Sequence, residues 1–287
     1  MNNFWKLMKS APIAAKIGMV IILLNVFAAL FAPIIAPYAE TDLVGDIWEG
    51  GFWDDTAPEH DPPAILGTDH IGRDMFTRLI YGARNTIGIA FATTLLAFAI
   101  GISGGFIAAT LRGATDQILS RIVDVFMAIP TLIFALMILS VLGTEVKVLI
   151  GVIATLDATR VYRISRAVAM DIEVMEYVEV AKLRGEGLWW IISHEILPNA
   201  LAPLIAEFGL RFCFVFLFIA ALSFLGLGLQ PPTADWGSMV RENAALINYG
   251  IVVPLIPAGA IALLTVGVNL VVDWFLHKAS GIRDVEE

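Results

Sequence analysis

Long apolar runs dominate the chain, and polar residues gather in the segments between them. Six runs come close to the roughly 20 mostly apolar residues that a helix needs to cross the hydrocarbon core of a membrane. They cover residues 17–36, 86–111, 117–142, 146–162, 201–229 and 251–275. The pattern predicts an all-α polytopic membrane protein with six transmembrane helices.

Three of these runs contain features that disturb a regular span. The first follows a short basic segment and resembles a secretory signal, but its length and two prolines at its end favour an uncleaved helix. Pro130 is expected to kink the third run. Asp157 and Arg160 make the fourth the weakest of the six.

Composition strengthens the membrane interpretation. Of the 287 residues, 58% are hydrophobic and 16% are charged, whereas a soluble domain has about 25% charged residues. These values argue against a soluble globule and against disorder. The single cysteine, Cys213, lies inside an apolar run, so we expect a small packing residue and no disulfide framework, zinc site or other metal site.

The net charge of −9 is concentrated in one segment. Ten acidic residues and only two arginines lie between Glu40 and Arg78, which gives this segment −8 of the total. The rest of the chain is nearly neutral. It therefore offers no basic face that could neutralise the phosphates of nucleic acid.

The distribution of Lys and Arg sets the expected orientation. Twelve of the 18 lie on the side of the N-terminus, five lie on the other side, and Arg211 lies within a span. This predicts a cytoplasmic N-terminus (1–16), a first transmembrane helix (17–36), an acidic periplasmic segment (37–85), a transmembrane core (86–275) with a cytoplasmic loop (163–199), and a cytoplasmic C-terminus (276–287).

The cytoplasmic loop contains a short amphipathic helix. Tyr177, Ala181 and Arg184 share one helical face, and Gly185 is placed to end the helix as its C′ residue. Short helices are marginal alone, so an exposed one is expected to dock into a groove on a partner. A membrane-surface helix is the alternative, but the polar face carries as many acidic residues as basic ones.

Three motifs resemble one family. Glu179-Val180-Ala181, Gly185 and Leu197-Pro198 resemble the EAA loop of bacterial binding-protein-dependent ABC importer permeases. Residues 66–74 (LGTDHIGRD) and 222–232 (LSFLGLGLQPP, followed by Asp235-Trp236-Gly237) resemble motifs of its dipeptide/oligopeptide branch, second permease subunit. Val180 and Glu195 depart from the EAA pattern, and the acidic, tryptophan-containing residues 46–60 are unlike the family's usual linker.

The resemblance implies a type I ABC importer permease fold in the bacterial inner membrane. It implies a heterodimer with a homologous permease, two cytoplasmic ATPases that bind ATP and Mg, and a periplasmic or lipid-anchored binding protein that delivers di- or oligopeptides. The chain has no G-x-x-x-x-G-K-[ST] loop, so we expect no ATPase activity and no cofactor of its own. A nickel or oligosaccharide importer, or an ATP-independent transporter or channel, stays open as an alternative.

Candidate site residues fall into three groups. The resemblance implies coupling to the ATPase for Tyr177, Glu179, Ala181, Gly185, Leu197 and Pro198. A periplasmic rim or gate is the functional hypothesis for Gly67, Thr68, Asp69, Gly72, Arg73, Asp74, Gly226, Gly228 and Trp236; turn geometry, an Asp/Arg surface network and a plain loop are the structural alternatives. Composition adds Trp48 and Trp53, either as guards of the pore or as contacts for the binding protein. Trp236 also suits an interfacial membrane anchor. Helical spacing pairs Arg121 with Asp124 and Glu207 with Arg211 inside spans; these pairs either hold helices together, which we favour, or line the solute path.

Overall fold

The computed structural model describes residues 11–54, 58–249 and 253–279. Parts of the predicted N-terminus (1–16), acidic segment (37–85), last apolar run (251–275) and C-terminus (276–287) lie outside these ranges. The described residues form helices and no strands, apart from two isolated bridges, Leu43 with Arg73 and Thr68 with Asp74. This confirms the predicted all-α class.

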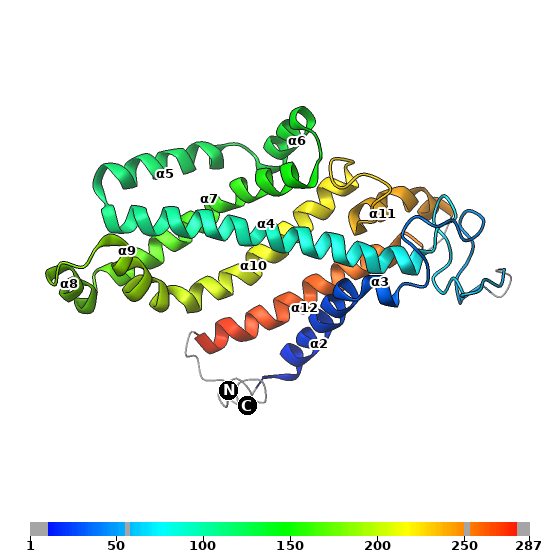
Figure 1. Ribbon diagram of the computed structural model, residues 1–287, viewed down its shortest axis with the longest axis horizontal. Helices are drawn as coiled ribbons and strands as arrows, with labels where there is room; N and C mark the ends of the chain where they lie inside the picture. The colour runs from blue at the N-terminus through cyan, green and yellow to red at the C-terminus, as the bar shows by residue number, and fades with distance from the viewer. Residues whose placement is uncertain (1–10, 55–57, 250–252, 280–287) are drawn as a thin grey trace. The chain divides into compact units, whose positions relative to one another are not determined.

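Figure 1 shows the helices in chain order. Their bounds are α2 Ile13–Leu30, α3 Ala32–Ile35, α4 Met75–Leu111, α5 Gly113–Ala128, α6 Thr131–Leu142, α7 Val146–Glu173, α8 Glu176–Leu183, α9 Leu188–Trp190, α10 Leu197–Phe224, α11 Trp236–Asn243 and α12 Leu255–Ala279. A π-helical turn, η1 (Ile191–Ile196), joins α9 to α10, and a 3₁₀ helix, η2 (Ala244–Tyr249), follows α11.

Four helical stretches are long and apolar enough to cross a membrane. They are Ile13–Leu30, Met75–Leu111, Leu188–Phe224 and Leu255–Lys278. Helices α5 and α6 qualify together as a fifth, although they are bent by 87° where they meet. Helix α7 contains the predicted fourth span and is not among the candidates, so a count of six spans stays a prediction.

The bend between α5 and α6 occurs at Pro130. Helix α5 ends at Ala128 and α6 begins at Thr131, because proline lacks an N–H and keeps the preceding residue out of the helical region. The rings of Phe126 and Phe134 meet edge to face across the break, with centroids 5.9 Å apart. The expected kink is therefore a full break of the helix.

Helix α4 begins at Met75, well before the expected start of the second span at Thr86. The backbone N–H of Thr77 donates to Asp74 Oδ2 at 2.7 Å, so Asp74 is an N-cap of the ordinary kind. Residues 75–85, which we expected in the periplasmic segment, thus form the first turns of α4.

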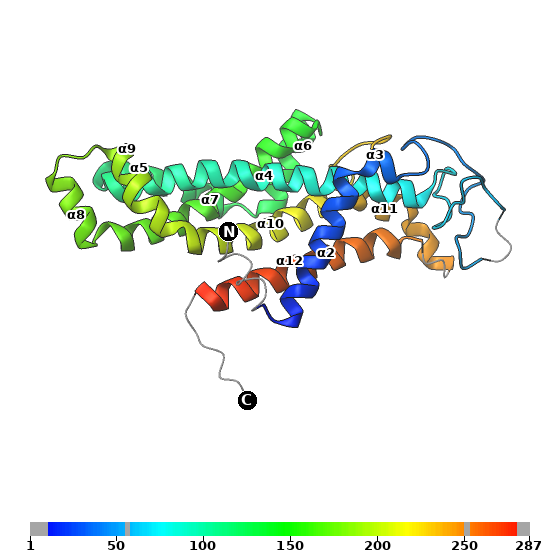
Figure 2. The same ribbon diagram turned by 60° about the horizontal axis from the view of Figure 1, so that its bottom comes forward.

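The chain divides into two compact units. The first comprises the described residues within Met1–Phe91, Leu142–Leu149 and Phe216–Val271, and the second those within Ala92–Val141, Ile150–Val215 and Val272–Glu287. In the first unit, α2 crosses α12 (Figure 2), and a methyl group added at Gly18 would lie only 2.5 Å from the carbonyl oxygen of Gly267. Small residues at this crossing let the two backbones approach closely.

The second unit has an apolar core at the end where the cytoplasmic loop is expected. Buried side chains from α4, α7, α8, η1 and α10 meet there, among them Phe106, Ile172, Val178, Ile192 and Leu204. Helices α8 and α9 lie where α7 ends and α10 begins (Figure 1). The short helix of the loop is therefore part of a packed core.

Candidate functional site

Helix α8 ends in a Schellman motif. The N–H of Gly185 donates to the carbonyl of Lys182 at 3.0 Å, and the N–H of Glu186 donates to the carbonyl of Ala181 at 3.2 Å. Gly185 has a φ of +83°, a conformation in which glycine pays no steric penalty. The predicted position of Gly185 at the end of the helix is confirmed.

One side of α8 is packed and the other is open. Val178 and Ala181 are fully buried in the core of the second unit, whereas Tyr177, Val180 and Leu183 are 41%, 52% and 82% exposed. Three-residue steps place the last three in one stripe. The sequence grouped Ala181 with Tyr177 on one docking face; this is corrected, because Ala181 lies on the packed side. Val178 had no predicted role.

The chain returns to the membrane through the π turn η1. Pro198 follows this turn and has no N–H to donate, and its ring would collide with the carbonyl four residues earlier in a regular α-helix. The wider π turn relieves this conflict. Its residues Ile191, Ile192 and Ile196 are buried, while Leu197 is half-buried and both Pro198 and Glu179 are exposed. The π turn was not predicted from the sequence, although Pro198 accounts for it.

The carboxylate of Glu173, at the end of α7, pairs with two basic side chains. Arg112 donates through Nε at 2.8 Å and approaches with Nη2 at 2.7 Å, both to Glu173 Oε2. Lys182 of α8 donates to Glu173 Oε1 at 2.6 Å. Sequence reasoning missed Glu173, because its partners lie 61 residues before it and 9 residues after it.

In the first unit, the LGTDHIGRD motif builds a buried polar network. Asp69 Oδ2 accepts from Arg73 Nε at 2.8 Å and from Arg78 Nη1 at 2.5 Å. The same Arg78 nitrogen donates to Glu242 Oε2 at 2.8 Å, and Arg73 Nη2 reaches it at 3.4 Å. All four side chains are at most 7% exposed. The network joins the motif to α4 and α11.

Asp69 stays ionised within this network. Burial acts to raise the pKa of Asp69, but the backbone N–H groups of Arg73 and Ile71 and the guanidinium groups of Arg78 and Arg73 outweigh burial, so the pKa is lowered. Hydrogen bonds and opposite charges both favour the charged form of a carboxyl group. The sequence had singled out Asp69 and Arg73 here but not Arg78 or Glu242.

The acidic segment folds onto this motif. Trp48 donates its backbone N–H to the carbonyl of Asp69 at 3.1 Å, and Thr68 Oγ1 donates to the carbonyl of Asp46 at 2.6 Å. Gly67 has a φ of +73°, and a Cβ there would lie 2.2 Å from the carbonyl oxygen of Glu49. A Cβ at Gly72 would likewise lie 2.2 Å from the carbonyl oxygen of Gly45. The rings of Trp48 and Trp53 stay partly exposed.

Helix α11 is fixed to the start of α4 by buried contacts. Thr86 Oγ1 donates to Asp235 Oδ1 at 2.8 Å, and Asp235 Oδ2 caps α11 by accepting from the N–H of Ser238 at 3.0 Å. Burial dominates the surroundings of Asp235 and raises its pKa. Trp236 is 1% exposed and donates from Nε1 to the carbonyl of Leu79 at 2.9 Å. The expected interfacial anchor is corrected: Trp236 is a core residue.

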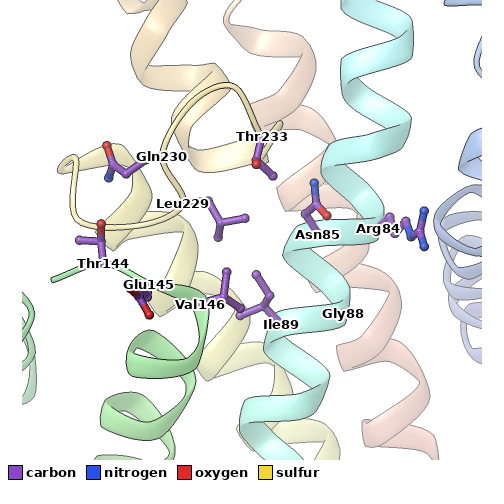
Figure 3. A pocket seen from close by; sticks show the side chains of 10 residues that line it. All are labelled: Arg84, Asn85, Gly88, Ile89, Thr144, Glu145, Val146, Leu229, Gln230 and Thr233. Carbon is purple, nitrogen blue, oxygen red and sulfur yellow. The ribbon is translucent and has the colours of Figure 1, made fainter. Parts of the chain in front are cut away.

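The turn before α11 needs its glycines. Gly226 has a φ of +88°, and a Cβ at Gly228 would lie 1.8 Å from Ser223 Oγ. Next to this turn lies a cavity of about 390 Å³, lined from α4, the start of α7 and residues 229–233. Figure 3 shows Arg84 on the side of α4 turned away from the other lining side chains. The amide nitrogens of Asn85 and Gln230 donate to backbone carbonyls, so their oxygens are the groups left for a solute.

One of the two expected polar pairs within spans is present, with further partners. Arg211 Nε donates to Glu207 Oε1 at 2.6 Å, as the spacing predicted. The structure extends this pair to α7, because the buried Asp157 lies 3.6 Å from Arg211 Nη1 and 3.5 Å from Arg160 Nη1. Arg160 also donates to Thr131 Oγ1 at 3.1 Å, at the start of α6.

The expected Arg121–Asp124 pair is corrected. Asp124 Oδ1 accepts instead from Arg163 Nη2 at 2.7 Å. Helix α5 lies beside α7 in the second unit (Figure 1), and a second bridge, from Arg166 Nε to Asp116 Oδ1 at 2.5 Å, joins the same two helices. Asp116 and Asp124 are thus both paired across the contact between α5 and α7.

One group of side chains has the composition of a metal site. Potential ligand atoms of Asp69, His70 and Glu242 lie within 4.8 Å of one another. Arg73 and Arg78 already bind both carboxylates, and a divalent cation would stand beside two guanidinium groups. The group therefore does not suit a metal ion.

Long apolar helices together with a short, half-exposed helix in a polar loop define a polytopic membrane protein with a surface for a partner. Comparison with known proteins gives the family. Residues 101–278 match the model of the binding-protein-dependent transport system inner membrane component, and residues 4–58 match the N-terminal TM domain of oligopeptide transport permease C. The chain belongs to this family of permeases, and it is a multi-pass inner-membrane transport subunit.

Relatives match over nearly the whole chain. The dipeptide transport system permease protein DppC of Haemophilus influenzae is 33% identical over 291 residues, which cover 99% of this chain and 93% of that protein. The di/tripeptide transport system permease protein DppC of Pseudomonas aeruginosa is 34% identical, with 93% and 85% covered. The glutathione transport system permease protein GsiD of Pectobacterium atrosepticum is 28% identical, with 99% and 89% covered. The resemblance seen in the motifs is confirmed.

Proposed function

We propose that this chain is one of two homologous permease subunits that form the import path for di- or oligopeptides in an ATP-driven importer. The peptide substrate is inferred from relatives that match most of the chain and are named as permeases for dipeptides, for di- and tripeptides, and for the peptide glutathione. The type I importer fold, six spans and cytoplasmic termini are part of the proposal. The salt-bridged Asp69 and Glu242 argue against a nickel path.

The observation that carries the proposal is the open stripe of α8. Tyr177, Val180 and Leu183 present apolar surface on a helix of eight residues, a length too short to be stable alone. Its packed side already holds it to the permease, so the open side is available for a second protein. A cleft on each of two cytoplasmic ATPases, which bind ATP and Mg, would receive this helix and that of the homologous permease.

The opposite face of the membrane would receive the peptide from a periplasmic or lipid-anchored binding protein. The cavity beside Gly226 and Gly228 presents acceptor oxygens of Asn85 and Gln230 and the carboxylate of Glu145. Such acceptors suit the N–H groups and the ammonium group of a peptide. The LGTDHIGRD network would hold the rim of this cavity rigid.

Co-purification of the ATPases tests the proposal. A carboxylate placed in the stripe by Leu183→Glu would be buried without a partner on docking, and we expect at least about a tenfold loss of bound ATPase. Phe52→Glu is the matched control: Phe52 is 77% exposed in the acidic segment, which the orientation places outside. Unchanged ATPase binding by the Leu183→Glu protein, or equal loss in both variants, would refute the proposed docking surface.

Substrate class is tested by uptake. Cells that lack other peptide permeases and express the complete importer should accumulate a labelled dipeptide, and an excess of unlabelled di- or tripeptide should compete. Competition by nickel or an oligosaccharide, with none by peptides, would reassign the substrate while leaving the ATPase docking intact.

A further inference from the structure

The junction of α4 and α5 carries an arginine where glycine is the ordinary choice. Arg112 has a φ of +52° and a ψ of −163°, a backbone region that is almost exclusive to glycine. The next residue is Gly113, so arginine occupies the strained position although a glycine follows it directly. A strained conformation persists only where its surroundings require it, and Arg112 adopts this one while its side chain binds Glu173.

Glu173 lies at the meeting point of three elements. It is the last residue of α7, Arg112 lies between α4 and α5, and Lys182 lies in the last turn of α8. The carboxylate of Glu173 is 2% exposed, whereas the Arg112 and Lys182 side chains are 57% and 41% exposed. The buried carboxylate of Glu173 therefore pairs with two basic side chains that remain partly exposed to solvent.

The bonds of Glu173 to Arg112 and Lys182, called the tie below, act together with an apolar contact. Val178 and Ala181 anchor one side of α8 in the core, but only two residues, Val174 and Met175, separate α7 from α8. Apolar packing is non-directional, so it resists sliding of α8 poorly. A charge-assisted hydrogen bond from Lys182 fixes the register of α8 against α7.

We propose that Glu173 is a positioning residue for energy coupling: by binding Lys182 and Arg112 together, it makes α8 move as one body with α7 and the α4–α5 junction. This inference rests on the proposed docking of α8 on an ATPase. Without the tie, a docked ATPase would move α8 while the connecting residues absorbed the displacement. ATP would then be hydrolysed with little import.

The test uses the complete importer, with its binding protein, in proteoliposomes. The measured quantity is the number of ATP molecules hydrolysed per peptide imported. Glu173→Gln keeps the shape of the side chain and removes its charge; we expect the amount of bound ATPase to stay the same and the ratio to rise about tenfold. Asp171→Asn is the matched control, an exposed acid on the same helix two residues earlier, and should leave the ratio unchanged.

A charge-inverted triple variant, Arg112→Glu/Glu173→Lys/Lys182→Glu, separates a tie from a need for these particular residues. The proposal predicts that it restores the ratio to within about threefold of the wild type. A wild-type ratio for Glu173→Gln, or a triple variant that assembles but stays uncoupled, would overturn it. If Glu173→Gln alone fails to fold, the triple variant decides in the same way.

Failure of this inference and failure of the proposed function give different results. Loss of the tie alone leaves ATPase bound to the Glu173→Gln importer, as judged by co-purification. A wrong docking surface shows itself earlier, when Leu183→Glu retains the ATPase.

Discussion

The buried network of the first unit and the tie of the second unit solve related problems in opposite ways. In the network, two arginines and two carboxylates, all nearly inaccessible, form ion pairs with one another. In the tie, one buried carboxylate binds two cations that remain about half exposed. The network is neutral and closed, so it belongs to the fold. The tie has two positive charges for one negative charge and remains in contact with water, so a partner that binds there can change the strength of its ion pairs.

The largest effect is expected in the network. Arg78→Met removes the closer of the two guanidinium groups that bind Asp69 and Glu242 and leaves two buried carboxylates to share Arg73, which costs about 3–5 kcal/mol. Thermal unfolding in detergent should show a large drop in the midpoint. Arg84→Met is the control, since Arg84 is exposed on the same helix; equal midpoints for the two variants would show that the network is not a closed structural unit.

An intermediate effect is expected at the cap of α11. Asp235→Ala removes the acceptor that caps α11 and should cost about 0.5–2 kcal/mol, whereas Asp235→Asn keeps an acceptor and should cost less. Buried Asp235 has a raised pKa, so the folded state binds a proton more readily than the unfolded chain, whose Asp pKa is about 3.9.

The same residue predicts a pH dependence. Stability contributed by protonated Asp235 is present below the unfolded pKa and is lost as pH rises through the raised folded pKa. Asp235→Asn should remove this part of the slope in a series of unfolding midpoints from pH 4 upward. An identical slope in wild type and variant would contradict the assignment.

The smallest effect on stability is expected in the tie. Lys182→Gln removes a partly exposed ammonium group from the buried carboxylate of Glu173; because Arg112 still binds Glu173, the cost should stay below about 1 kcal/mol. The unfolding midpoint should barely move. A drop as large as that of Arg78→Met would erase the contrast between a closed network and an adjustable tie.

Sequence reasoning succeeded where local chemistry decides the outcome. Apolar runs gave the long helices, Pro130 gave the break, and Gly185 gave the end of α8, because each depends on neighbouring residues. The i, i+4 spacing likewise gave the bond of Arg211 to Glu207.

It failed where distant segments meet. The burial of Trp236 depends on α11 folding back onto α4, and the partner of Asp124 depends on α7 lying beside α5. Glu173 had no predicted role, since nothing in its neighbourhood points to Arg112. Which side of α8 is packed also followed from tertiary contacts, because both sides carry apolar residues.

The break at Pro130 has a consequence for the membrane environment of α5 and α6. A helix that stops leaves the carbonyl groups of its last turn without partners along the chain, and hydrocarbon tails offer no hydrogen bonds to replace them. The surface around residues 125–131 must therefore be bathed by water or covered by another polypeptide rather than by lipid. The break therefore marks the place where the surface of α5 and α6 ceases to face lipid.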